Sequence, residues 1–167
     1  MGPLVIRALL LALALALGPS EAMARESLGV FAGWGAFRDP NVPRCYAITM
    51  AEPTGRQRDY QPYASIGTWP KRAIRGQVHF RLSRQLAPST AITLSIAGRR
   101  FNLEGGGGDA WAVDPTTNAA IIAAMRSAQW MTITARDSRS RRFADSWKLG
   151  GAATAMDAAT VGCAQLR

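Results

Sequence analysis

Alternating apolar and polar residues predict that much of the chain forms β-strands. Val78, Phe80 and Leu82 alternate with polar neighbours, which is the two-residue period of a strand with one buried face. Residues 91–96 repeat this pattern. Other apolar segments predict strands over residues 30–37, 45–50, 63–69, 101–103, 130–135 and 143–149. Since the outer faces are polar, the pattern favours antiparallel sheets with one side in water.

Two segments depart from the strand pattern and predict short helices. Asp114 can accept hydrogen bonds from the free amides of a first helical turn, and Pro115 fits that turn, so a helix is expected over residues 118–127. A second helix is expected over the alanine-rich residues 152–159, whose small side chains should let it lie close to a sheet. Together the segments predict a mainly β single domain with β-sandwich-like antiparallel sheets and two short helices.

Polar and glycine-rich segments between the strands predict the turns. Residues 97–100 and 136–142 are expected to be hairpin turns. The glycines at 105–108 could suggest a phosphate-binding loop, but Asp109 follows them where that motif requires Lys and Ser or Thr, so a flexible connection within the sheet is expected. The tryptophans are expected in the core, although such rings can also stack on sugars or bases. Trp69, before Pro70, is expected to be the most exposed of them.

The N-terminal residues predict export from the cytoplasm. Arg7 precedes an apolar run over residues 8–17, and Ala22 and Ala24 match the small-residue pattern of a cleavage site. The apolar run is about half the length that spans a bilayer, which favours a cleaved signal peptide over an uncleaved anchor. We therefore expect a signal peptide over residues 1–24 and an exported domain over residues 25–167, periplasmic or secreted, with no later transmembrane segment.

Export changes how the two cysteines are interpreted. In an oxidising compartment Cys45 and Cys163 are expected to form a disulfide, whereas free thiols are the alternative. Closing so long a loop would stabilise the fold by about 4 to 5 kcal/mol on the loop-entropy model. No metal site is expected, because His79 is the only histidine and two thiols do not complete a zinc site.

The charge of the chain predicts an anionic partner. The formal net charge is +9, and of the twenty basic residues only Lys71 and Lys148 are lysines. Arginine binds phosphate and carboxylate groups through paired hydrogen bonds, although a solvated hairpin tip or arginine-rich genomic composition are alternative explanations. After export, anionic envelope components are expected rather than nucleic acid. The candidate anion-binding residues are Arg99, Arg100, Arg136, Arg139, Arg141 and Arg142.

The sequence carries no recognisable catalytic signature. A nucleophile elbow is absent, the single histidine lacks a partner motif, and the acids form no known pair. We therefore expect neither an enzyme nor a cofactor.

The order of these segments resembles the invasion associated locus B family of exported bacterial proteins. The resemblance rests on Trp34 followed by residues 44–48, on residues 92–96, 118–126 and 131–134, and on a final strand leading into residues 151–156. It implies a compact β-sandwich-like domain behind a signal peptide, secreted, periplasmic or associated with the outer membrane, without established catalytic residues. This chain keeps two cysteines, whereas some members have more.

These expectations combine into a binding or structural protein of the cell envelope whose basic surface faces an anionic component or a partner protein. Two alternatives remain at this stage. An inhibitor or chaperone-like partner of another envelope protein should expose a discrete apolar patch. A hydrolase of envelope polymers should have a cleft in which polar groups with shifted pKa values converge.

Overall fold

The computed structural model describes residues 25–164, which form ten strands, two α-helices and one 3-10 turn. The elements are β1 (Glu26–Phe31), β2 (Trp34–Asp39), β3 (Arg44–Met50), β4 (Tyr63–Trp69), η1 (Pro70–Arg72), β5 (Ile74–Arg81), β6 (Ile92–Ile96), β7 (Arg99–Gly106), β8 (Asp109–Ala112), α2 (Pro115–Ser127), β9 (Trp130–Arg136), β10 (Arg142–Lys148) and α3 (Ala152–Ala164). The expected signal peptide, residues 1–24, lies outside the described residues.

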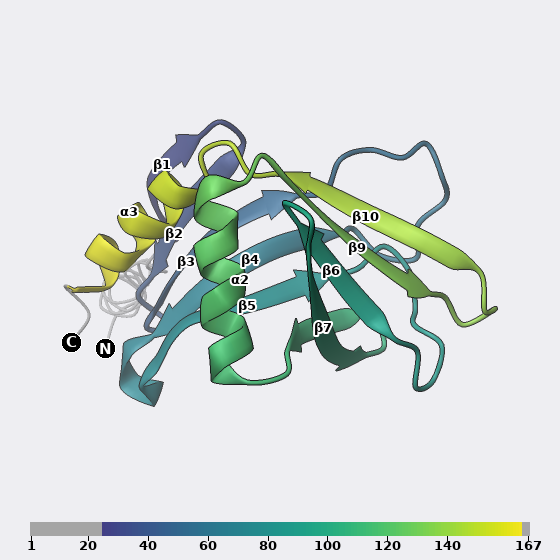
Figure 1. Cartoon of the computed structure of the whole chain (residues 1–167). Coiled ribbons are helices and arrows are strands. Elements are labelled where there is room, and N and C mark those ends of the chain that lie inside the picture. Colours follow the sequence, from purple (N-terminus) through teal and green to yellow (C-terminus); the bar gives the residue numbers. More distant parts are fainter. Residues whose placement is uncertain (1–24, 165–167) are drawn as a thin grey trace, which may run out of the picture.

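All ten strands belong to one antiparallel sheet in the order β1-β2-β3-β4-β5-β8-β7-β6-β9-β10. The sheet turns back on itself, so that the β6–β10 half lies over part of the β1–β5 half (Figure 1). The contact between Phe80 of β5 and Trp147 of β10, with ring centroids 5.6 Å apart, joins the two halves through the core. The predicted mainly β, antiparallel single domain is confirmed, and its two layers are two parts of a continuous sheet.

The two helices cover the part of the β1–β5 half that the other strands leave open (Figure 1). Asp114 caps α2 by accepting a hydrogen bond from the Thr117 N–H at 2.7 Å, as its place before Pro115 predicts. Asn118, one turn further along α2, bonds the backbone of β5 at both Gly76 and Val78. These bonds attach α2 to the edge of β5 at residues where β8 does not pair with β5.

Helix α3 lies close to the sheet because its contacting residues are small. It packs against β1, β2 and β3 through residues that include Ala152, Ala155 and Gly162. The helix continues to Ala164, beyond the predicted end at residue 159, so Cys163 lies within the helix. The disulfide between Cys45 and Cys163 is present, with the two Cα atoms 5.6 Å apart. It joins α3 to β3, and the predicted pairing is confirmed.

The first predicted strand, residues 30–37, is wrong, because the structure has a hairpin there. Ala32 and Gly33 form the turn between β1 and β2 with φ values of 45° and 90°. Positive φ at both central residues is the geometry of the tight turns that join twisted antiparallel strands. The apolar residues continue through the turn, and this continuity conceals it in the hydrophobic pattern.

The glycine run at residues 105–108 is a sheet connection, as predicted, but its first two residues lie within a strand and only Gly107 and Gly108 form the turn. Gly105 and Gly106 end β7, and the turn leads directly into β8, which the sequence did not predict. Similarly, Arg99 and Arg100 begin β7 instead of lying in the preceding turn, which consists of Ala97 and Gly98.

The tryptophans divide between core and surface. Trp34 and Trp147 are fully buried, whereas Trp69 and Trp111 are half-buried. Trp130 is 47% exposed and lies under the ammonium group of Lys148, 5.5 Å from the ring centroid. The expectation that Trp69 would be the most exposed is therefore wrong. Neither helix within residues 25–164 has the length and apolar character needed to cross a bilayer.

Candidate anion-binding site

The hairpin between β9 and β10 is organised by the buried carboxylate of Asp137. Its Oδ1 atom accepts hydrogen bonds from the N–H groups of Arg139 and Arg141, at 3.0 and 2.9 Å. Its Oδ2 atom accepts a hydrogen bond from Nε of Arg141 at 3.0 Å, and the guanidinium group of Arg141 completes an ion pair at 2.8 Å. The side chain holds the turn in one conformation, as aspartate does in many tight turns.

The hydrogen bonds of Asp137 also change its acidity. Burial raises the pKa of this carboxyl, but the N–H groups of Arg141 and Arg139 and the Arg141 charge outweigh burial, so the pKa of Asp137 lies below its ordinary value. Asp137 is therefore ionised at neutral pH, and it offsets part of the positive charge of this hairpin.

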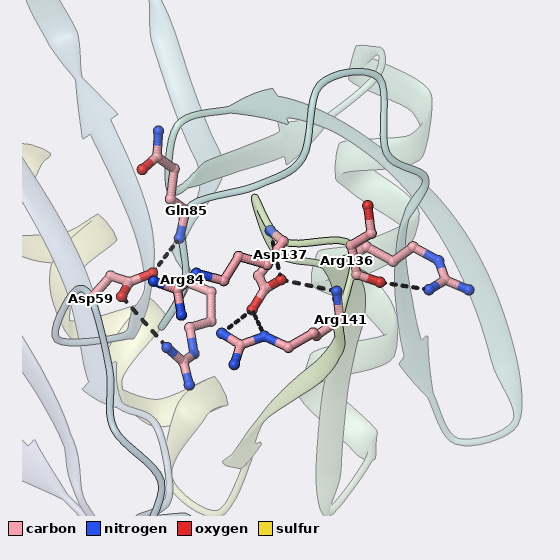
Figure 2. A network of polar contacts seen from close by, with 8 residues as sticks. Asp59, Arg84, Gln85, Arg136, Asp137 and Arg141 are labelled. Atoms are coloured by element: carbon pink, nitrogen blue, oxygen red, sulfur yellow. Dashed lines mark hydrogen bonds and ion pairs between the residues drawn. The ribbon is translucent and has the colours of Figure 1, made fainter.

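A second loop holds the hairpin from the side. The Ser138 N–H donates to the Gln85 carbonyl oxygen at 2.8 Å, in the loop that follows β5. In the same loop, Gln85 and Arg84 donate to the carboxylate of Asp59 at 3.0 and 3.5 Å. Figure 2 shows Asp59, Arg84, Asp137 and Arg141 in this polar network. Three segments far apart in the sequence are thereby held together at one end of the molecule.

These segments form a basic pocket of about 640 Å³. Its lining includes five arginines and a single carboxylate, that of Asp137. An adjoining pocket shares Arg56 and Arg142 and adds Arg136. We use the name arginine surface for the set Arg56, Arg58, Arg84, Arg136, Arg141 and Arg142.

Two arginines of this surface lie directly opposite each other. Arg136 at the end of β9 pairs with Arg142 at the start of β10, and both side chains are exposed. Like charges at facing positions of an antiparallel pair destabilise it. Within residues 25–164, none of Arg56, Arg136 and Arg142 forms an ion pair with a carboxylate. An anion bound between them would relieve this repulsion.

A buried acid lies behind the arginine surface. Asp145 of β10 is 1% exposed, and its Oδ2 atom accepts a hydrogen bond from the Ser83 N–H at 2.8 Å. Its Oδ1 atom has no hydrogen-bond partner among the described residues. Burial raises the pKa of Asp145 above its ordinary value, although the Ser83 hydrogen bonds and the charges of Arg58 and Arg84 oppose the shift.

The six arginines expected from the sequence do not form one site. Arg136, Arg139, Arg141 and Arg142 lie on or beside the β9–β10 turn. Ile96 of β6 faces Met131 of β9, so the turn that precedes Arg99 and Arg100 lies near the start of β9. Arg136 ends β9 about 17 Å further along, at about 3.3 Å per residue. The structure therefore separates Arg99 and Arg100 from the hairpin cluster.

Three residues of the arginine surface are not predicted from the sequence as anion-binding residues. Arg56 and Arg58 lie in the loop between β3 and β4, and Arg84 follows β5. They are brought to the hairpin by the pairing of distant strands, and by contacts such as the Asp59 N–H bond to the Ser83 carbonyl oxygen at 2.8 Å. No local sequence signal connects them with residues 136–142.

His79, the single histidine, belongs to a different cluster on the outer face of the sheet. Its Nε2 atom lies 3.0 Å from Oδ1 of Asp109, which also pairs with Arg81 at 2.5 Å, and its ring stacks on Trp111. The portion of the chain that the structure describes contains no group of three His, Cys, Asp or Glu side chains placed to hold a metal ion.

Comparison with known protein families, with curated proteins and with solved structures finds no match to this chain. The fold and the arginine surface define an antiparallel β protein with two covering helices, one disulfide and a basic pocket. Membership of the invasion associated locus B family stays a prediction from the sequence.

Proposed function

We propose that the chain is an exported, non-enzymatic protein of the bacterial envelope that binds an anionic component through the arginine surface. The observation that carries this proposal is the pocket of about 640 Å³ lined by five arginines and one carboxylate. The chemical class of ligand is a phosphate-bearing one, such as the headgroup of an anionic lipid or lipopolysaccharide, because the guanidinium fork matches phosphate oxygens.

The proposed export is supported by two features of the chain. The N-terminal residues have the pattern of a signal peptide, and the two cysteines form a disulfide. Disulfides persist in oxidising compartments and are rare in the cytosol. A periplasmic or secreted location is consistent with both features and with the resemblance to the invasion associated locus B family.

A hydrolase is the second candidate, because Asp137 and Asp145 have pKa values shifted in opposite directions near one pocket. The burial of both carboxyls favours binding over hydrolysis. Asp137 is 3% exposed and Asp145 is 1% exposed, and each carboxyl accepts hydrogen bonds from backbone N–H groups that hold a loop in place. These bonds are typical of carboxyls with a structural role.

The proposal is tested by binding of the disulfide-bonded protein, residues 25–167, to vesicles over a salt series. The protein should bind phosphatidylglycerol vesicles and bind phosphatidylcholine vesicles weakly. Because salt screens exposed charges with a Debye length of about 10 Å at 0.1 M, the affinity should fall steeply as salt is added. Absent binding, or an affinity that salt does not change, would refute an electrostatic function.

A pair of matched variants then locates the binding. Arg136→Glu with Arg142→Glu should weaken binding at least about tenfold, since each cation near an anionic surface contributes about 1 kcal/mol. Arg99→Glu with Arg100→Glu makes the same change in net charge about 17 Å away along the strand, and should weaken binding less. Equal losses in the two variants would show that net charge, and not the arginine surface, attracts the vesicle.

A further inference from the structure

A groove lies between α2 and α3, over β4 and the start of β5. It has a volume of about 690 Å³, within the range of pockets that bind small molecules. Its floor is apolar and is provided by side chains such as Ile66, Ile122 and Met156. At its lip, Val161 of α3 is 70% exposed. We call this feature the interhelical groove.

The rim of the interhelical groove is cationic. Lys71, Arg75 and Arg126 line it, and the described lining residues include no aspartate or glutamate. Arg126 pairs across to Asp157 of α3 at 2.6 Å, a contact that joins the two helices. Lys71 and Arg75 are exposed, and neither forms an ion pair with another of residues 25–164. These two cations are available to a ligand.

The groove offers few hydrogen bonds to a bound peptide. The Thr160 hydroxyl already donates to the Met156 carbonyl oxygen at 2.8 Å, and the Thr68 hydroxyl accepts from the Gly76 N–H at 3.0 Å. The open edge of β5 is occupied by Asn118, which bonds Gly76 and Val78. A peptide strand therefore has no free sheet edge to extend here, whereas a hydrocarbon chain needs no hydrogen bonds.

From these features we infer that the interhelical groove binds a single acyl chain that carries an anionic head group, such as a long-chain fatty acid. The chain lies on the apolar floor and its carboxylate pairs with Lys71 and Arg75. Such a ligand matches both the apolar floor and the unpaired cations of the rim. The groove and the arginine surface share no lining residue, so this second site does not depend on the proposed function.

The inference is tested by calorimetric titration of the disulfide-bonded protein with dodecanoate below its micelle concentration. Dodecanoate should bind with one-to-one stoichiometry, and hexanoate should bind at least about a hundredfold more weakly because it buries fewer methylenes. Dodecyltrimethylammonium, which has the same chain and the opposite charge, should also bind more weakly. Because apolar burial can have an enthalpy near zero at one temperature, the titration is repeated at a second temperature. No heat with dodecanoate at either temperature, or equal affinity for the cationic amphiphile, would overturn the inference.

Variants of exposed residues then place the ligand. Thr160→Trp adds a large side chain at the lip of the groove and should reduce dodecanoate affinity at least about tenfold, whereas Thr154→Trp on another part of α3 should not.

The cations of the rim are tested separately. Lys71→Glu with Arg75→Glu should reduce dodecanoate affinity by a similar factor. Arg99→Glu with Arg100→Glu is the charge-matched control, and this comparison decides the question if Thr160→Trp does not fold. Unchanged affinity in the folded groove variants would contradict the inference. Arg136→Glu with Arg142→Glu should leave dodecanoate binding intact, which separates this site from the arginine surface.

Discussion

Single residues decide how the two ends of this domain are held together. Cys45 is fully buried in β3 and Cys163 is 5% exposed in α3, so the disulfide lies inside the apolar core. The bond closes a loop of 118 residues. On the loop-entropy model a closure of this length stabilises the folded state by about 4 to 5 kcal/mol, which is a large part of the stability of a small domain.

Replacing either cysteine tests this contribution. Cys45→Ser and Cys163→Ser should each lower the free energy of unfolding by about 4 kcal/mol, because each removes the same bond. The double variant and the reduced wild-type protein should show a similar loss in urea denaturation. Clearly unequal losses in the two single variants would contradict a shared bond as the main source of the effect.

Asp145 gives the fold a pH dependence of definite sign. Its pKa is raised in the folded protein above the ordinary 3.8, so the folded state keeps a proton that the unfolded chain has released. The stability contributed by the protonated acid is complete below about pH 4 and declines as the pH rises through the raised pKa. Asp145→Asn stays neutral and should lack this decline.

Thermal melts from pH 4 to pH 7 measure this difference. The melting temperature of Asp145→Asn should rise relative to that of the wild type as the pH increases. Asp145→Ala is the control for the hydrogen bond, because it leaves the Ser83 N–H without a partner and should cost about 1 to 3 kcal/mol relative to Asp145→Asn at every pH. A constant difference between Asp145→Asn and the wild type would show that this carboxyl does not titrate as described.

At the scale of elements, the hydrophobic pattern predicts what depends on local sequence. The regular alternation around Val78 and Ile92 predicts strands β5 and β6, and Asp114 with Pro115 marks the start of α2. The pattern fails where apolar residues continue through a turn, as at Ala32, and where a strand is short and held only by its neighbours, as β8 is. In both places the tertiary pairing decides the structure.

The approach of α3 to the first hairpin can be tested at Gly151, which precedes the helix. A Cβ atom at this residue would lie 1.9 Å from the Phe31 carbonyl oxygen, and φ is +81°. Gly107 also has a positive φ of +62° but open space around a Cβ. Gly107→Ala should cost about 1 kcal/mol for the backbone conformation alone, whereas Gly151→Ala should cost at least about 3 kcal/mol because the backbone must also move. Equal losses in urea denaturation would show that the close approach is not tight.

At the scale of the whole molecule, the arginine surface arises from the topology. The sequence predicts the arginines of residues 136–142, because they are adjacent in the chain. It could not predict Arg56, Arg58 and Arg84, because only the folding of one sheet half over the other brings them to the same pocket. For the same reason it could not show that Arg99 and Arg100 lie at the other end of β9.

The central claim is that arginines from three separate segments form one anion-binding surface. Its most direct test is an NMR titration of the arginine Nε–H signals with inorganic tripolyphosphate, a soluble polyanion without an acyl chain. The signals of Arg56, Arg84, Arg136 and Arg142 should shift together along one binding curve, while those of Arg99 and Arg100 stay in place. Shifts centred on Arg99 and Arg100, or no saturable shift on the arginine surface, would contradict the account.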